Sequence, residues 1–260
     1  MPHIPRTRFA KEIVAEFLPP SNRQKIKGDK VVIICSGMPM LPRKGAGGLM
    51  EFFARKGYWV FYPRYRGSWE SGGSFLRFSP EKDIKDIIDQ LPKGFVSAGM
   101  KASERKRYRV DPRTIVLVAG SFGGPAGILM SRDKRVSRVI AISPVVDWKA
   151  HIKGGETIDA MYPFTQEAFG KGYRMTRTNW NKLKTGQFYN PMPHWQEIDG
   201  RKLFIVHAKD DDSVPWKDVA KFAKLTGAPL KLLNRGGHLS SATIMSPRYY
   251  PAIQRFLKQK

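Results

Sequence analysis

The sequence predicts an α/β protein made of one domain, in which helices flank a mainly parallel sheet. Short apolar segments alternate with amphipathic segments along most of the chain, which is the pattern of strands that alternate with helices. The length of 260 residues suits a single sheet domain that carries an insertion, and an apolar content of 41% provides a full-sized core. We therefore expect one domain over residues 1–260.

Two strands and two helices are expected in the first part of the chain. The first strand, Ile13–Leu18, stops at a pair of prolines, and the second, Lys30–Cys35, is buried because apolar β-branched residues follow one another in it. Helices are predicted over Gly47–Lys56 and Pro80–Leu91, since apolar residues recur there at helical spacing. These residues are Leu49, Phe52 and Phe53 in the first helix and Ile84, Ile87, Ile88 and Leu91 in the second.

The later part of the chain continues the alternation. Strands are expected over Thr114–Val118, Leu203–His207 and Leu230–Leu233, and helices over Pro215–Leu225 and Tyr250–Leu257. Because crossover connections between parallel strands are short and right-handed, the loops that follow these strands can converge at one edge of the sheet.

Two segments interrupt the alternation. Pro92–Pro112 is a basic stretch that we expect to be a solvated loop, and Lys149–Arg201 is a longer insertion that we expect to form a cap over the active site. The insertion is rich in aromatic residues, which either line an apolar substrate pocket or pack the cap onto the core. They are Tyr162, Phe164, Phe169, Tyr173, Trp180, Phe188, Tyr189 and Trp195.

A serine follows the strand Thr114–Val118 in a sharp turn. Residues 119–124 read Ala-Gly-Ser-Phe-Gly-Gly, which is a relaxed form of the G-x-S-x-G nucleophile elbow. The elbow needs small residues two positions before and two positions after the serine, and Ala119 and Gly123 stand there. Ser121 is therefore the candidate nucleophile.

A serine hydroxyl needs a base and a group that orients the base. Asp210, Asp211 and Asp212 occupy the loop after the strand Leu203–His207, and His238 lies in a glycine-containing loop after the strand Leu230–Leu233. The chain order of serine, aspartate and histidine is that of the α/β-hydrolases.

The chain resembles the α/β-hydrolases over about residues 30–258, and most closely the catalytic domains of the prolyl-oligopeptidase (S9) family and related dipeptidyl peptidases and esterases. Besides the triad segments, Gly57–Gly73 is similar to a strand and Tyr-Arg-Gly loop of that family, and Ser143–Trp148 resembles its next strand end. The family's spacing between a strand-end histidine and a Val-Pro pair implies Asp211 as the acid. Asp210 and Asp212 are then ordinary loop carboxylates, and Asp147 is the alternative acid.

The resemblance also implies an oxyanion hole. The family's loop is usually His-Gly-x-Pro, and residues 36–39 here read Ser-Gly-Met-Pro, so Ser36 replaces the histidine. By position, the backbone N–H groups of Met38 and Phe122 would bind the developing oxyanion.

The remaining histidines and the cysteine are predicted to be structural. His207 ends an apolar strand and is expected to support the site through a hydrogen bond, whereas His3, His151 and His194 lack a comparable context. No histidine pair has the spacing of metal ligands, and the lone Cys35 is expected to be a small buried residue. We therefore expect no metal and no organic cofactor.

The chain is strongly basic, with 46 Lys and Arg against 22 Asp and Glu, and the cations are dispersed along the whole sequence. Dispersion indicates a general surface property, so no specific nucleic acid is expected as a partner, although polyanions would bind at low salt. No segment approaches the roughly 18 apolar residues of a membrane span, and no signal peptide is evident, which favours the cytoplasm.

The sequence thus predicts a serine hydrolase that cleaves carboxylic esters through a Ser121, His238 and Asp211 triad and an acyl-enzyme. One alternative is an S9-like peptidase acting on short peptides, and another is a noncatalytic polyanion-binding protein on a hydrolase scaffold. The esterase is preferred because the segment before Lys30 leaves no room for a propeller domain. The insertion also offers few carboxylates for a substrate ammonium: Glu156, Asp159, Glu167, Glu197 and Asp199.

Overall fold

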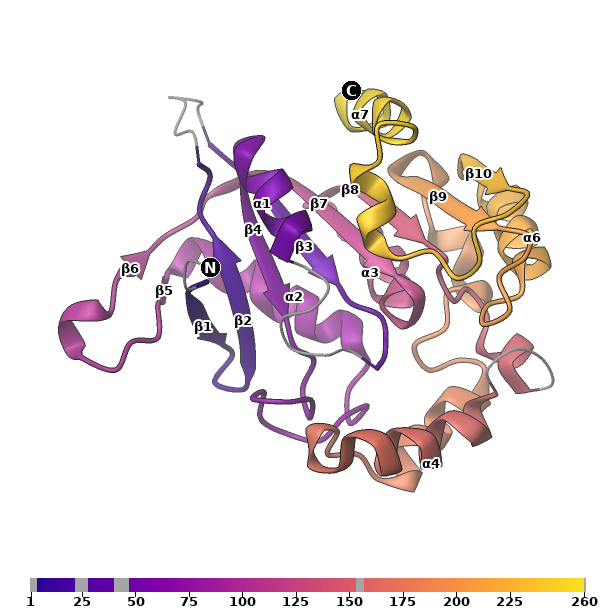
Figure 1. Ribbon diagram of the computed structural model, residues 1–260, viewed down its shortest axis with the longest axis horizontal. Helices are drawn as coiled ribbons and strands as arrows, with labels where there is room; N and C mark the ends of the chain where they lie inside the picture. Colours follow the sequence, from indigo (N-terminus) through magenta and orange to yellow (C-terminus); the bar gives the residue numbers. More distant parts are fainter. Residues whose placement is uncertain (1–3, 22–27, 40–46, 153–156, 260) are drawn as a thin grey trace.

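The structure, a computed structural model, describes residues 4–21, 28–39, 47–152 and 157–259 (Figure 1). Its main sheet has eight strands in the order β1-β2-β4-β3-β7-β8-β9-β10. β1 pairs antiparallel with β2 and β2 antiparallel with β4, and the other neighbours in this order are parallel. The strands are β1 (Arg6–Phe9), β2 (Ile13–Leu18), β3 (Asp29–Cys35), β4 (Tyr58–Pro63), β7 (Pro112–Gly120), β8 (Val136–Ile142), β9 (Leu203–Ala208) and β10 (Leu230–Leu233).

Helices cover both faces of the sheet, which confirms the predicted α/β class. The alternation of side chains along β3 sends Val31 and Ile33 into one apolar cluster and Val32 and Ile34 into another. The first cluster contains residues of α2 (Pro80–Gln90), α3 (Gly124–Met130) and α6 (Trp216–Thr226). The second contains residues of α1 (Gly47–Arg55) and α7 (Tyr250–Lys258). Because both faces of the central parallel strands are covered, β3, β4 and β7 each contain a continuous run of buried residues.

Short 3-10 helices connect many of these elements. They are η1 (Leu91–Lys93), η2 (Ala102–Glu104), η3 (Ser121–Gly123), η4 (Trp148–Ile152), η5 (Gly170–Gly172), η6 (Lys182–Thr185), η7 (Met192–Glu197), η8 (Gly200–Lys202) and η9 (Ser241–Met245). Across the described parts of the chain, every helix is too short or too polar to cross a lipid bilayer.

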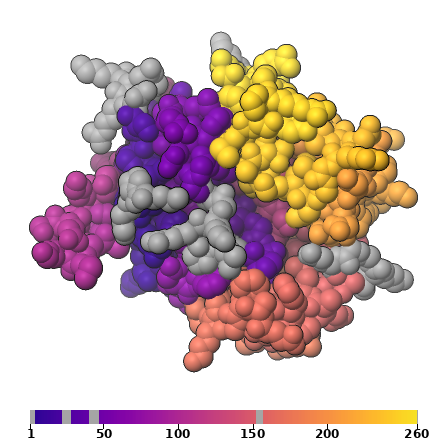
Figure 2. Space-filling model, in the orientation of Figure 1, coloured from indigo at the N-terminus to yellow at the C-terminus, as the bar shows by residue number. Residues whose placement is uncertain are grey.

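The basic stretch Pro92–Pro112 is largely exposed, as predicted, but it also contains regular elements that the sequence did not predict. It contains a hairpin of β5 (Phe95–Val96) and β6 (Arg107–Tyr108), which projects from the side of the molecule (Figure 2). Phe95 is 3% exposed and its ring packs on the rings of Phe9, Phe17 and Tyr108. The aromatic residues at its base anchor the hairpin, while its cations point to solvent.

The insertion, residues 149–201, contains α4 (Ile158–Phe169) and α5 (Arg177–Asn181) and forms the lower edge of the molecule in Figures 1 and 2. It is joined to the loop after β4 by isolated bridges from Ser68 to Tyr173 and from Phe75 to Met175. The insertion therefore packs against the body of the domain.

The Tyr-Arg-Gly loop after β4 is held by a buried arginine. The guanidinium of Arg66 contacts the carboxylates of Asp83 and Glu12, and it donates to Asp86 at 2.8 Å. Arg66 and Asp83 are 8% and 3% exposed, so the charges are shielded from water. The network fixes the loop against the start of α2.

We expect Arg66→Met to lower the free energy of unfolding by about 3–5 kcal/mol, because it leaves the Asp83 carboxylate buried without its cation. Urea unfolding of the purified protein measures this loss. The control is Arg55→Met, which removes an exposed arginine 3.8 Å from Glu51 and should cost only about 0.3–0.5 kcal/mol. Equal effects of the two substitutions would contradict the role given to Arg66.

Candidate active site

Ser121 lies in the turn between β7 and α3 with φ of +49°, a left-handed conformation that is uncommon for a serine. The two small residues of the motif, Ala119 and Gly123, lie where larger side chains would meet close neighbours. A Cβ added to Gly123 would lie 2.2 Å from the Cys35 carbonyl oxygen, and one added to Gly127 would lie 2.5 Å from the Cβ of Ala119. The turn therefore packs tightly against the end of β3 and onto its own strand.

Two other loops approach the serine. A Cβ on Gly37 would lie 3.2 Å from the Cβ of Ser121, so the loop after β3 borders Ser121 directly. A Cβ on Gly120 would lie 2.7 Å from the Oγ of Ser241, which follows His238 in the chain. The structure thus brings the loops after β3, β7 and β10 to one edge of the sheet, as the sequence predicts.

Asp211 and His238 are in direct contact. The Nδ1 atom of His238 lies 3.0 Å from both carboxylate oxygens of Asp211. The Asp211 side chain is fully shielded from solvent, whereas 29% of the His238 side chain is exposed. Because an ionised carboxylate only accepts hydrogen bonds, Nδ1 must carry the proton, which leaves Nε2 of the neutral ring as a proton acceptor.

The Asp211 carboxylate is stabilised in its charged form. Its Oδ1 accepts from the backbone N–H groups of Ser213 at 3.1 Å and Val214 at 2.9 Å. Burial acts to raise its pKa, but the hydrogen bonds from His238 and Val214 outweigh burial and lower the pKa below its ordinary value. The group therefore stays ionised through the neutral pH range.

His207 supports the acid loop, in line with the role predicted for it. Its side chain is fully buried, and Nε2 lies 3.0 Å from the Val214 carbonyl oxygen and 3.5 Å from Oδ2 of Asp211. Burial lowers the pKa of His207, so the ring is neutral and Nε2–H donates to the carbonyl. The contact holds the loop closed over Asp211.

The neighbouring aspartates differ from one another. Asp210, predicted to be an ordinary loop carboxylate, is exposed, and it accepts from the N–H groups of Gly236 at 3.2 Å and Gly237 at 2.9 Å, a link between loops that the sequence did not predict. These bonds lower the pKa of Asp210 and tie its loop to the loop of His238. Asp212 is exposed, and its Oδ1 lies 3.5 Å from the Ser213 hydroxyl.

The alternative acid, Asp147, makes hydrogen bonds within the insertion and at its start. Its Oδ1 accepts from the Lys149 N–H at 3.1 Å and from the side-chain amide of Asn190 at 2.9 Å. It thereby anchors the start of the insertion, and the carboxylate found against His238 is that of Asp211.

We expect Asp210→Ala to lower kcat about tenfold, because the Gly236–Gly237 turn that precedes His238 loses both of its side-chain acceptors. Initial rates with an activated ester measure the effect. Asp212→Ala is the matched control in the same loop and should leave kcat within about twofold of the parent. Indistinguishable rates for the two variants would show that Asp210 does not position the histidine.

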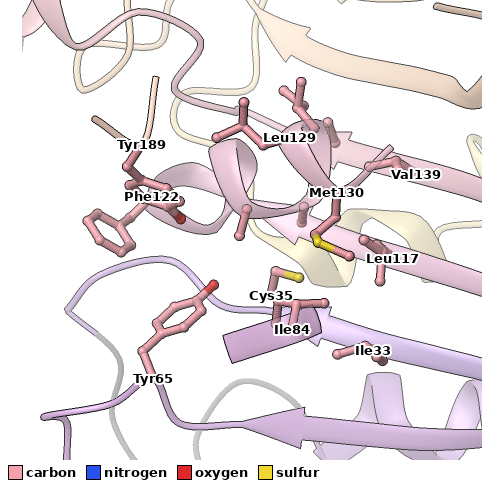
Figure 3. Packing of buried hydrophobic residues seen from close by; sticks show 14 of the residues in the cluster. Ile33, Cys35, Tyr65, Ile84, Leu117, Phe122, Leu129, Met130, Val139 and Tyr189 are labelled. Atoms are coloured by element: carbon pink, nitrogen blue, oxygen red, sulfur yellow. The ribbon is translucent and has the colours of Figure 1, made fainter. Parts of the chain in front are cut away.

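Of the two predicted oxyanion donors, Phe122 directly follows Ser121 in the chain, and Met38 follows Gly37, the residue whose added Cβ would lie 3.2 Å from the Cβ of Ser121. Phe122 is 1% exposed, and Figure 3 shows its ring beside Tyr189, with Tyr65 directed toward the same region. The Tyr189 hydroxyl donates to the Phe122 carbonyl at 2.6 Å, and the Tyr65 hydroxyl donates to the Ser36 carbonyl at 3.4 Å. These bonds fix the backbone at Phe122 and at Ser36, in the two loops that carry the predicted oxyanion donors Phe122 and Met38.

Several aromatic residues of the insertion pack into the apolar core of the domain. Tyr173, Trp180 and Tyr189 are 3%, 0% and 2% exposed and belong to the main apolar cluster. Phe164, at 55% exposure, lies on the surface. For these residues the packing interpretation fits better than the pocket interpretation.

Comparison with known proteins identifies the relatives of this architecture. The model of the prolyl oligopeptidase family matches residues 48–259. Acylaminoacyl peptidase from Pyrococcus horikoshii has a similar structure, with a TM-score of 0.66, 18% identity and coverage of 98% of this chain and 41% of the peptidase chain. The chain thus spans less than half the length of that peptidase.

A second similar structure is the esterase Pf2001 from Pyrococcus furiosus, with a TM-score of 0.64, 17% identity and coverage of 97% of this chain and 88% of the esterase chain. No curated protein matches the chain in sequence. The structural neighbours are α/β-hydrolases, which confirms the predicted α/β-hydrolase fold.

Proposed function

The chain belongs to the prolyl oligopeptidase family of serine hydrolases, and on this premise we propose that it cleaves carboxylic esters with Ser121, His238 and Asp211 as its triad. The observation that carries the proposal is the contact of 3.0 Å between Asp211 and Nδ1 of His238 at the sheet edge that also holds Ser121. A buried carboxylate that orients a histidine, at the sheet edge that also carries a serine in a sharp turn, fits a serine hydrolase.

The proposed reaction has two steps. Nε2 of His238 accepts the proton of the Ser121 hydroxyl while the oxygen attacks the ester carbonyl, and Asp211 stabilises the imidazolium that forms. The N–H groups of Met38 and Phe122 receive the charge of the tetrahedral intermediate. The imidazolium then protonates the departing alcohol, and a water molecule, activated by the same histidine, releases the acid from Ser121.

The charges of the insertion support an ester over a peptide with a free N-terminus. Such a peptide needs unpaired carboxylates for its ammonium group, and three insertion carboxylates already pair with cations of the protein. Asp159 lies 2.5 Å from Lys184, Glu197 lies 2.6 Å from Arg132, and Asp199 lies 3.0 Å from Arg201. The similarity to an esterase over 88% of its length also supports this choice.

Peptidase action is the second candidate, because the structural neighbours include an acylaminoacyl peptidase. A substrate panel separates the two functions. With p-nitrophenyl butyrate, an N-acetyl-phenylalanine anilide and a free alanine anilide, we expect kcat/KM to be highest for the ester by at least about a hundredfold.

The Ser121→Ala variant is the control for the panel, because only hydrolysis that it loses belongs to this site. Faster release from either anilide than from the ester, lost in Ser121→Ala, would overturn the esterase proposal. Preference for the acylated over the free anilide would then assign acylaminoacyl peptidase chemistry.

A further inference from the structure

Ser143 combines two features that are rarely found together. It follows β8 with φ of +42°, in the left-handed region where a glycine would be free of strain, and its side chain is fully buried. Its own N–H donates to the Val206 carbonyl of β9 at 2.9 Å, which fixes its backbone. A buried serine at a position that favours glycine indicates that the hydroxyl itself is used.

The hydroxyl lies between the two loops that carry the histidine and the acid. Its Oγ accepts from the backbone N–H of Leu239, the residue after His238, at 3.1 Å. It also lies close enough to the Asp211 carboxyl to contribute to the lowered pKa of that group. Since a hydroxyl can accept one bond while it donates another, Ser143 can link both loops at once.

We propose that the Ser143 hydroxyl is a positioning group that holds the His238 loop against the Asp211 loop. This inference rests on the proposed function, because it assigns Ser143 a role through those two residues. β8 lies between β7 and β9 in the sheet, so its end is the natural place for a residue that spans the site. Asp210 ties the same histidine loop through Gly236 and Gly237, on the side away from Leu239 in the chain.

The test replaces Ser143 with glycine and with alanine and measures kcat, KM and the pH profile of kcat/KM on p-nitrophenyl butyrate. Glycine removes the hydroxyl and relieves the left-handed backbone, so the protein should fold, whereas alanine removes the hydroxyl and keeps the strain. Ser240→Ala, at an exposed serine of the same loop, is the matched control.

We expect both Ser143 variants to lose kcat by about tenfold to a hundredfold with KM unchanged, the effect of a misplaced catalytic group. The acid limb of kcat/KM should also move to lower pH. Without Ser143, the His238 loop is held less closely to the Asp211 carboxylate, so the imidazolium of His238 loses part of its stabilisation. The other titratable groups around this pair, His207, Asp210 and Arg235, are unchanged in both variants.

Three results would overturn the inference: a kcat for Ser143→Gly within about twofold of the parent, a change confined to KM, or a loss of kcat without a shift of the acid limb. An unchanged kcat in Ser143→Gly would leave Ser143 only a role through its backbone. Either of the other two results would leave its hydroxyl only a general structural role. A different result would overturn the proposed function itself: a His238→Ala or Ser121→Ala variant that retains the parent activity.

Discussion

Ser121→Ala is expected to abolish covalent labelling by a fluorophosphonate and to lower kcat toward esters by roughly 10⁶-fold. In the proposed mechanism the serine oxygen forms the acyl-enzyme, so that without it the oxyanion donors and binding contacts would supply only residual catalysis. The substitution removes one oxygen atom from a turn that is packed by Gly123 and Ala119, so the thermal unfolding midpoint should stay close to that of the parent. Gel-based labelling and initial rates with p-nitrophenyl butyrate provide the two measurements.

Ser68→Ala is a suitable control for this experiment. Ser68 is buried, and its hydroxyl donates to the Tyr65 carbonyl at 2.7 Å, so it is a serine outside the catalytic elbow. The control should retain the label and the activity of the parent. Label that persists in Ser121→Ala, or that maps to a peptide containing Ser36, Ser68 or Ser143, would place the nucleophile elsewhere.

Asp211→Asn is expected to lower kcat by about 10⁴-fold, as the corresponding change does in the best-studied triad. The asparagine amide would donate to Nδ1 of His238, so the ring proton would move to Nε2 and the histidine could no longer accept the serine proton. Single-turnover acylation with a p-nitrophenyl ester measures the step that depends on this tautomer.

Asp212→Asn controls for the loss of a charge in the same loop and should change kcat by no more than about twofold. The thermal unfolding midpoint of Asp211→Asn needs to be checked, because Asp211 also accepts from the N–H groups of Ser213 and Val214. A folded Asp211→Asn protein with nearly the parent kcat would exclude Asp211 as the acid and direct attention to Asp147.

The sheet and the candidate triad could be predicted from local patterns. Ile13–Leu18 and Leu230–Leu233 have the predicted bounds in the structure, because short apolar segments with clear stops specify strands without reference to the rest of the chain. The contact between Asp211 and His238 could also be predicted, since both residues follow parallel strands and the carboxyl ends of such strands lie at one edge of the sheet.

The roles of Asp210 and Ser143 could not be predicted in this way. Asp210 acts on Gly236 and Gly237, which lie on another strand end, and the Ser143 hydroxyl acts on Leu239. These contacts depend on φ values and on the registers of neighbouring strands, which no local sequence pattern contains. The hairpin of β5 and β6 was missed because each strand has only two residues and β6 lies within a run of cations.

The order of the strands in the chain has a consequence for the time at which activity is acquired. β7 precedes the proposed nucleophile, whereas the proposed base follows β10, more than 100 residues later in the chain. A nascent chain that has passed Ser121 but not His238 contains a serine without its base and is expected to be inert toward esters. The docking of β10 and α7 depends on contacts between residues that are distant in sequence. In refolding experiments, we therefore expect ester hydrolysis to recover later than the burial of Trp148.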